Sequence, residues 1–174
     1  WYYNSAGNIT QSQANLLAYS NQFDNAAWTK SNSFVQTNLL TYSEQFDNAA
    51  WAKGNVTVTA NATTAPDGTI TADKLEVTTA ASTLTYQDFV ATSTIHTFSV
   101  YVKQGSGASD SNSFGVRNVT LASIIAMLTI DYSTGVVTQT TGTGAYSVNA
   151  GNGWWRIVIP CTSGITVGNT LRPY

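Results

Sequence analysis

The sequence predicts an all-β protein, an antiparallel sandwich of two sheets, and three observations support this prediction. Apolar and polar residues alternate along 96–103 and 154–160, which is the period of a half-buried strand. Segments of this kind recur between turns rich in Gly and Asn, as they do in sandwiches. The chain has 27 threonines and 9% charged residues, a composition that favours pleated, half-buried surfaces. Because two twisted sheets bury alternate side chains between them, we expect a jelly roll.

Two regions are expected: an N-terminal extension or linker at 1–37 and the jelly-roll sandwich at 38–174. The extension contains the first copy of a repeat, residues 15–32 (NLLAYSNQFDNAAWTKSN), and the domain begins with the second copy, residues 38–55 (NLLTYSEQFDNAAWAKGN). The two copies agree at 14 of 18 positions. A solenoid needs at least three units, so we interpret the repeat as a duplicated edge element.

Each copy is expected to have local structure of its own. The segment QFDNAAW has the length of one helical turn, and Asp24 and Asp47 are placed to cap it. In both copies the aromatic pair, Phe23 with Trp28 and Phe46 with Trp51, is expected to pack together, because burial of large aromatics fixes a short edge segment. Between the copies, residues 33–37 (SFVQT) are expected to form a short strand.

The remaining strands and turns are predicted from the alternation of apolar and polar residues and from the turn-forming residues between them. Residues 65–68 (APDG) are a turn, since Pro presets φ and Gly accepts a positive φ. Residues 104–113 have the composition of a flexible loop. Cys161 has no partner for an internal disulfide and is expected to be buried as a small hydrophobe. The expected strands are 56–63, 84–90, 96–103, 114–120, 124–131, 136–140, a brief strand at 146–148, and 154–160.

Charge and hydropathy exclude two classes of partner. The net charge is −2 and lysines and arginines do not cluster, whereas nucleic-acid binding requires a basic surface. The longest apolar stretch, residues 121–130, is shorter than the roughly 20 residues that span a bilayer. We therefore expect neither nucleic-acid binding nor membrane insertion.

Catalysis is not expected, and no cofactor is implied. Glycan hydrolysis needs two carboxylates a few ångströms apart, but most of the nine acidic residues stand in turn-like contexts. His96 is the only histidine and lies at the start of a strand without a nucleophile motif. Asp67, Asp73 and Asn61 could offer oxygen ligands to calcium, but they form no dense acidic cluster, so no metal site is predicted.

Glycan binding is a separate possibility, because sugars are recognised by aromatic platforms flanked by polar groups. Trp155 and Trp154 are adjacent on a strand and must face opposite ways. If Trp155 joins Ile157 and Ile159 in the core, Trp154 shares the other face with Arg156. A candidate glycan-binding groove then consists of Tyr101, Trp154, Arg156 and Gln87. The alternative is that these residues form an ordinary polar sheet face or meet a second layer of protein.

Four segments together resemble a family of bacteriophage head-spike or head-fibre (tail appendage) proteins, whose domains are jelly rolls similar to carbohydrate-binding modules. The first is residues 38–75, NLLTYSEQFDNAAWAKGNVTVTANATTAPDGTITADKL. The others, in the same order as in the family, are TFSVYVKQGSG, DYSTGVV and GNGWWRIVI. Two features depart from the family. The NLL signature occurs twice, and the given sequence does not include the family's closing strand with a Trp-Gly-Ala-Gln-Leu-Glu-like motif, which is either absent, supplied by a neighbour or cut off.

The resemblance implies a virion structural protein, located on the capsid or tail surface as a head fibre, capsid decoration or tail appendage subunit. Its partners would be other virion proteins and copies of itself, with a trimer favoured. The first copy is the candidate assembly interface, through Leu16, Leu17, Phe23 and Trp28. The alternative function is a glycan-binding receptor-recognition module of a phage fibre that contacts a host surface glycan. A secreted bacterial adhesin domain is also compatible with the composition.

Overall fold

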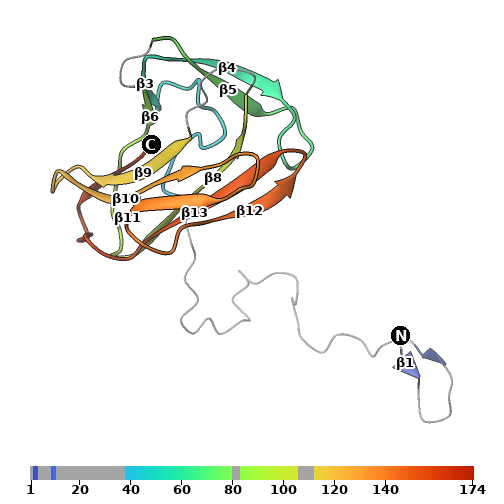
Figure 1. Cartoon of the computed structure of the whole chain (residues 1–174). Helices are drawn as coiled ribbons and strands as arrows, with labels where there is room; N and C mark the ends of the chain where they lie inside the picture. The colour runs from blue at the N-terminus through green and yellow to red at the C-terminus, as the bar shows by residue number, and fades with distance from the viewer. Residues whose placement is uncertain (1, 4–8, 11–37, 80–82, 106–111) are drawn as a thin grey trace. The chain divides into compact units, whose positions relative to one another are not determined.

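A computed structural model of the chain describes residues 2–3, 9–10, 38–79, 83–105 and 112–174 (Figure 1). The chain divides into two compact units, Trp1–Thr37 and Asn38–Tyr174. In the first unit the described strands, β1 (Tyr2–Tyr3) and β2 (Ile9–Thr10), pair antiparallel. The first repeat copy and the strand predicted at 33–37 lie outside the described residues.

The second unit is all-β, as predicted: its described residues contain strands and turns and no helix, and the strands pair antiparallel. None of the described residues belongs to a helix that could cross a membrane. The strands are β3 (Ala52–Gly54), β4 (Val56–Thr63), β5 (Ala72–Val77), β6 (Leu84–Tyr86), β7 (Phe89–Val90), β8 (His96–Lys103), β9 (Ser113–Asn118), β10 (Ser123–Ile130), β11 (Val137–Thr141), β12 (Tyr146–Gly151), β13 (Trp154–Cys161) and β14 (Thr170–Pro173).

Two larger sheets enclose the main core (Figure 1). The five-stranded sheet has the order β11-β10-β9-β14-β7, and the three-stranded sheet has the order β12-β13-β8. Leu128 and Ile130 of β10 are fully buried with Ile157 and Ile159 of β13, because alternate residues of each sheet point inward. Two smaller antiparallel pairs, β3-β6 and β4-β5, complete the domain.

The alternation read from the sequence correctly predicts the core faces. Phe98, Val100 and Val102 of β8 are partly buried and pack against the core cluster, and so does Trp155 of β13. The predicted burial of Cys161 is also confirmed, since its side chain is 1% exposed. The turn at 65–68 is present, with Gly68 N donating to the Ala65 carbonyl at 3.0 Å and Gly68 at φ 89°.

One predicted strand is wrong in an informative way. Residues 84–90 are not a single strand: β6 pairs with β3, whereas β7 pairs with β14 of the five-stranded sheet. Gln87 and Asp88 lie at the point where the chain passes from one sheet to the other. The break coincides with the consecutive polar residues Gln87 and Asp88, after which the alternation of Leu84 and Tyr86 does not continue in phase to Phe89.

An additional strand, β14, lies between β9 and β7 inside the five-stranded sheet. Its Leu171 is fully buried, and the Tyr174 backbone exchanges hydrogen bonds with Gly115 at 2.9 and 3.0 Å. Strands β3, β5 and β14 were not predicted, because each is short or surrounded by polar residues.

A polar group also lies inside the core. The Asn118 side chain is fully buried and donates to the Gly164 carbonyl at 2.9 Å and to Asn169 Oδ1 at 2.8 Å. Its own Oδ1 accepts from the Leu121 backbone N–H at 3.1 Å. Because buried polar groups are costly without partners, these bonds fix the loop 164–169 against β9.

Candidate binding face and docking site

The outer face of the three-stranded sheet is the first candidate site. We use this name for the side chains of β8, β13 and β12 that point away from the core. Tyr101 and Tyr146 are about half exposed on it, and Val148 is similarly exposed. Register places Val148, Arg156 and Tyr101 in one row across the three strands. The face thus combines aromatic and apolar surface with two cations, Arg156 in this row and Lys103 at the end of β8.

Arg156 and Tyr101 form the centre of this face. They are directly opposite each other on β13 and β8, and the guanidinium carbon lies 5.9 Å from the centre of the tyrosine ring. Arg156 Nη2 also donates to Ser99 Oγ at 3.3 Å. Cation–π contact at this distance orients the guanidinium over the ring. The pair therefore presents a flat ring beside a fork of hydrogen-bond donors, both accessible from solvent.

Trp154 belongs to the same side of β13 but is covered. Its side chain is only 8% exposed, and its Nε1 donates to the Thr64 carbonyl at 3.1 Å. Lys103, its register partner, places Nζ 6.0 Å from the ring centre. The structure therefore brings Trp154 to the end of the outer face, where it supports the loop that contains Thr64 and has little free surface to offer a ligand.

Gln87 does not contribute to the outer face, because its carboxamide is used elsewhere. Oε1 accepts from Thr41 N at 2.7 Å and from Thr41 Oγ1 at 3.3 Å. Nε2 donates to the Thr41 carbonyl at 3.1 Å and to the Ala50 carbonyl at 3.2 Å. A carboxamide has two donor hydrogens and two acceptor lone pairs, so this buried side chain is fully satisfied. The predicted four-residue groove is thus reduced to Tyr101 and Arg156, with Trp154 at its end.

The second repeat copy, to which Gln87 is bonded, is built from successive turns. Gln45 N donates to the Tyr42 carbonyl, Asn48 N to the Gln45 carbonyl and Trp51 N to the Asn48 carbonyl, at 2.9 to 3.1 Å. The helical turn predicted for QFDNAAW is therefore wrong for this copy, which forms no helix. The side chain that closes the final turn is Asn48, whose Oδ1 accepts from Ala50 N at 3.0 Å, and not Asp47.

The predicted aromatic pair is confirmed in the second copy. The ring centres of Phe46 and Trp51 are 4.6 Å apart, with a tilted arrangement. Trp51 is 5% exposed, and its Nε1 donates to the Tyr42 carbonyl at 2.9 Å. Burial of the ring stabilises the segment, while the bonded Nε1 avoids an unsatisfied donor.

Lys53 completes the internal structure of this copy. Its Nζ lies 2.8 to 3.2 Å from the carbonyl oxygens of Phe46, Asp47, Asn48 and Trp51, so its three N–H groups are shared among four acceptors. These carbonyls converge because the successive turns direct them to one side. A cation at their centre offsets the repulsion between the carbonyl dipoles, so the Lys53 ammonium stabilises the turns of the second copy.

Three elements of the sandwich hold the second copy, and we call them the docking site: Asp73, Gln87 and strand β6. Asp73 Oδ2 accepts from Phe46 N at 2.7 Å, and its Oδ1 accepts from Asn61 N at 2.9 Å. Strand β6 pairs with β3, with Lys53 opposite Thr85. The contacts between the docking site and the second copy are mostly made to the backbone of the copy.

The first copy, with the candidate interface residues Leu16, Leu17, Phe23 and Trp28, lies outside the described residues. Its counterparts in the second copy are Leu39, Leu40, Phe46 and Trp51, of which Trp51 is buried and the others are partly buried. The structure therefore shows how the second copy, residues 38–55, is folded and attached to the sandwich. It does not place the first copy on any surface.

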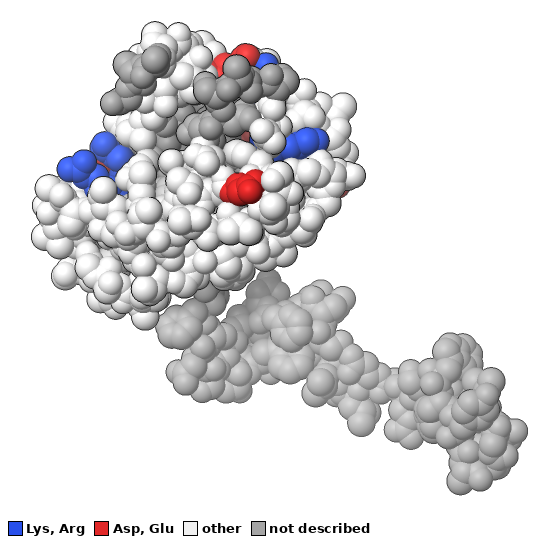
Figure 2. Space-filling view, viewed as in Figure 1, with Lys and Arg blue, Asp and Glu red and all other residues white. Residues whose placement is uncertain are grey.

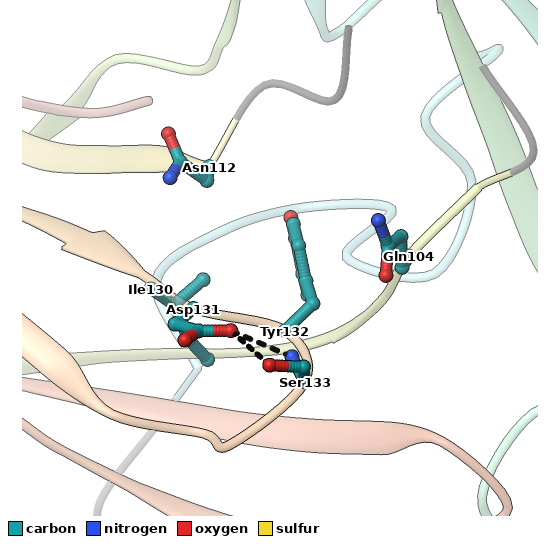
Figure 3. Close-up of a pocket in the computed structure, with 6 residues that line it drawn as sticks. All are labelled: Gln104, Asn112, Ile130, Asp131, Tyr132 and Ser133. Carbon is teal, nitrogen blue, oxygen red and sulfur yellow. Dashed lines mark hydrogen bonds between the residues drawn. The ribbon is translucent and has the colours of Figure 1, made fainter. Parts of the chain in front are cut away.

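Acidic residues in the turns are occupied by local hydrogen bonds. Bonds from the Ser133 side chain and backbone lower the pKa of Asp131, and the backbone bond from Thr69 lowers the pKa of Asp67. A pocket lies beside the first of these turns, and Figure 3 shows Asp131 bonded to Ser133 within it. The pocket is lined by Gln104, Asn112, Ile130, Asp131, Tyr132 and Ser133. The one carboxylate in the pocket, Asp131, accepts hydrogen bonds from Ser133 within its own turn. Its role in this arrangement is structural.

Other groups considered for chemistry also have structural partners. His96 packs edge-on against Phe89 at 5.5 Å and its Nε2 lies 3.1 Å from the Ser93 carbonyl. Arg172 forms a bidentate ion pair with Asp88, in which Nε and Nη2 each lie 2.7 Å from a carboxylate oxygen. The Arg172 guanidinium carbon lies 3.8 Å from the centre of the Tyr86 ring. Among the described residues no three His, Cys, Asp or Glu side chains are grouped to hold a metal ion.

The surface surrounding these sites is largely uncharged. Figure 2 shows a few separated basic and acidic groups on the viewed face of the domain, with uncharged residues between them. Interactions on such a surface depend on shape, hydrogen bonds and apolar contact more than on long-range attraction, so they are little screened by salt.

Sequence reasoning missed the docking site. It assigned Gln87 to a sugar groove and gave Lys53 no role. The sequence did contain one signal for Lys53, because the equivalent position of the first copy is also a lysine, Lys30. The repeat therefore preserves this lysine as well as the aromatic residues. Nothing in the sequence alone indicates that Gln87 and Asp73 form hydrogen bonds with the backbone of the second copy.

Comparison with models of protein families gives no match to this chain, and a comparison with curated proteins gives none either. The resemblance to phage head-spike proteins thus rests on the sequence segments quoted above.

Proposed function

We propose that this protein is a structural component of a bacteriophage virion, displayed on the capsid or tail surface as a head fibre, a capsid decoration or a tail appendage subunit. It acts by assembly and attachment and not by catalysis. Its partners are other virion proteins and further copies of itself, with a trimer favoured. The jelly-roll topology that the family resemblance implies belongs to the same proposal.

The observation that carries this proposal is the structural role of residues 38–55, the first part of the longest segment that resembles the phage family. Residues 38–55 form an internally bonded surface segment, held together by the buried Trp51 and by Lys53 and attached to the sandwich through Gln87 and Asp73. A motif that folds in this way builds a rigid display domain. The sparsely charged, Thr-rich exterior supports the same role, because attachment through it depends little on the salt content of the medium.

The test is made on particles of the phage whose genome encodes the chain. Particles are purified through a density gradient, digested and analysed by mass spectrometry, and intact particles are labelled with an antibody raised against the protein. The proposal predicts peptides from this chain in stoichiometric amounts and antibody label on the particle surface. Absence of the chain from pure particles, together with its presence in the infected-cell lysate, would refute the proposal.

A second function, glycan recognition, is favoured by the Arg156–Tyr101 pair. A half-exposed ring provides an apolar platform for a sugar, and the adjacent guanidinium provides hydrogen-bond donors for its hydroxyls or carboxylates. In this function the protein is the receptor-recognition module of a phage fibre and its ligand is a host surface glycan. The two functions are compatible, because the outer face is distinct from the docking site.

A further inference from the structure

We infer that the docking site accepts the first repeat copy, residues 15–32 of the same chain, in exchange for the second copy, residues 38–55. The chain then has one docking site and two competent occupants. This inference is independent of the virion assignment, because it rests on the contacts of the second copy and on the sequence of the first.

The docking site recognises main-chain atoms, which every sequence offers. Gln87 bonds to the backbone N–H and carbonyl of Thr41 and to the Ala50 carbonyl. Asp73 bonds to the Phe46 N–H. Strand β6 adds an antiparallel ladder with Ala52–Gly54. What the docking site requires of an occupant is therefore the right backbone shape.

The side chains that produce this shape are the same in both copies. In the second copy, side-chain bonds and ring contacts within the segment come from Asn38, Ser43, Phe46, Asn48, Trp51 and Lys53. The corresponding residues of the first copy are Asn15, Ser20, Phe23, Asn25, Trp28 and Lys30. Because each of these pairs is identical, the first copy carries the same side chains that hold the turns of the second copy.

The four positions that differ are tolerant in the structure. Ala18 in place of Thr41 loses one side-chain bond of 3.3 Å and keeps both backbone bonds. Glu44, replaced by Asn21, is exposed, and Ala52, replaced by Thr29, lies on a strand where β-branched residues are favoured.

The fourth position, Gly54, is replaced by Ser31 in the first copy. A Cβ added at Gly54 would meet only the Leu84 carbonyl oxygen, at 3.8 Å, which is ordinary van der Waals contact. The serine therefore fits without movement of the neighbouring strand.

Chain connectivity decides which copy is bound by default. The second copy runs directly into β4 at Val56, so its docking requires no additional loop between the copy and β4. With the first copy docked, the 23 residues 33–55 must leave the domain and return to Val56. The entropic penalty of loop closure rises only slowly with length, so this state is disfavoured but accessible. We expect the second copy to be docked in the native chain and the first to replace it when the second is damaged.

Tryptophan substitutions in the full chain test this exchange. The variants are Trp51→Ala, Trp28→Ala and the double variant, and the readout is the midpoint of denaturant unfolding. Exchange predicts a midpoint close to wild type for Trp28→Ala, a small decrease for Trp51→Ala, and a decrease in the double variant much larger than the sum of the two. If Trp51→Ala alone unfolds at the midpoint of the double variant, or if the double variant is as stable as wild type, the inference is wrong.

A disulfide experiment locates the first copy directly. Gly54 is the register partner of Leu84, so its counterpart Ser31 should take that place when the first copy is docked. In the Trp51→Ala background, Ser31→Cys with Leu84→Cys should form a disulfide within one chain under oxidising conditions. The matched control, Gly54→Cys with Leu84→Cys in the wild-type background, reports the default state. A control bond without a Ser31–Leu84 bond, or a bond that links two chains, would contradict exchange within the chain.

Discussion

The side-chain carboxamide of Gln87 pairs with the backbone of Thr41 as a neighbouring strand would. It accepts from the Thr41 N–H at 2.7 Å and donates to the Thr41 carbonyl at 3.1 Å, across 46 residues of sequence. One side chain thereby replaces a strand partner at the place where the chain changes sheets. This pairing attaches the second repeat copy to the sandwich and explains why residues 38–55 belong to the domain.

Replacement of Gln87 by leucine should destabilise the domain by about 2–4 kcal/mol, because it leaves partly buried backbone groups of Thr41 and Ala50 without partners. Gln87→Glu keeps the acceptor for the Thr41 N–H but loses the donor, so it should also destabilise. Urea denaturation followed by tryptophan fluorescence measures both.

Gln45→Leu is the control for this series, because Gln45 is an exposed glutamine within the second copy. Its effect should stay within about 0.5 kcal/mol of wild type. Neither repeat copy can compensate for a change at Gln87, since both need the same docking site. Equal stability of Gln87→Leu and Gln45→Leu would show that the carboxamide does not hold the segment.

Gly135 is expected to be intolerant of any side chain. Its φ is 75°, and an added Cβ would lie 2.3 Å from the Trp155 ring. Gly135→Ala combines the left-handed backbone penalty with overpacking, about 1–3 kcal/mol for the overpacking alone. Gly151→Ala is the matched control, because Gly151 has φ 81° and nothing within 4 Å of its Cβ position. Thermal unfolding of the two variants should differ, and equal melting temperatures would remove the predicted clash.

The Cys161 thiol should be unreactive in the folded protein. Burial raises its pKa from the ordinary value of 9.0 to about 11, so it stays protonated at neutral pH. A folded-state pKa that is raised contributes stability below the unfolded-state value of 9 and loses it as the pH rises toward 11. Stability should therefore fall between pH 9 and 11 in the wild type, and this part of the fall should be absent in Cys161→Ala.

Thiol labelling by a disulfide reagent with and without denaturant measures the first part of this prediction. Denaturant melts across the pH range measure the second. Rapid labelling of the native protein at pH 7 would contradict the buried, protonated thiol.

Glycan binding through the outer face should depend on Tyr101 and Arg156. Tyr101→Ala and Arg156→Ala should each weaken binding to any host polysaccharide that the wild type retains, by about tenfold for loss of a stacking platform or a charged donor. Arg117→Ala is the control, because Arg117 is an exposed arginine of β9 in the other sheet. A glycan array with unchanged signals for both outer-face variants would eliminate this site.

The sequence predicted the regular part of the fold well, for a physical reason. Strand β8 is long and half-buried, so alternation of Phe98, Val100 and Val102 with polar residues is visible without a structure. The same reasoning failed for β14, where burial of Leu171 depends on neighbours distant in sequence. Short strands carry too few residues to show a period.

The candidate site was predicted only in part. Strand parity correctly placed Tyr101 and Arg156 on one face, because it is a local property. It does not tell which residues of that face are covered, so it could not show that a loop containing Thr64 lies over Trp154. The role of Gln87 depends on a contact with a segment 46 residues away, which no local pattern encodes.

An electron cryomicroscopy map of the phage particle on which we propose the protein is displayed tests the central claim most directly. Our account predicts that a two-sheet domain is resolved on the outside of the capsid or tail, with residues 38–55 or 15–32 in the docking site and the row Val148–Arg156–Tyr101 facing away from the particle. A map without this domain, or one in which Gln87 and Asp73 contact neither repeat copy, would contradict it.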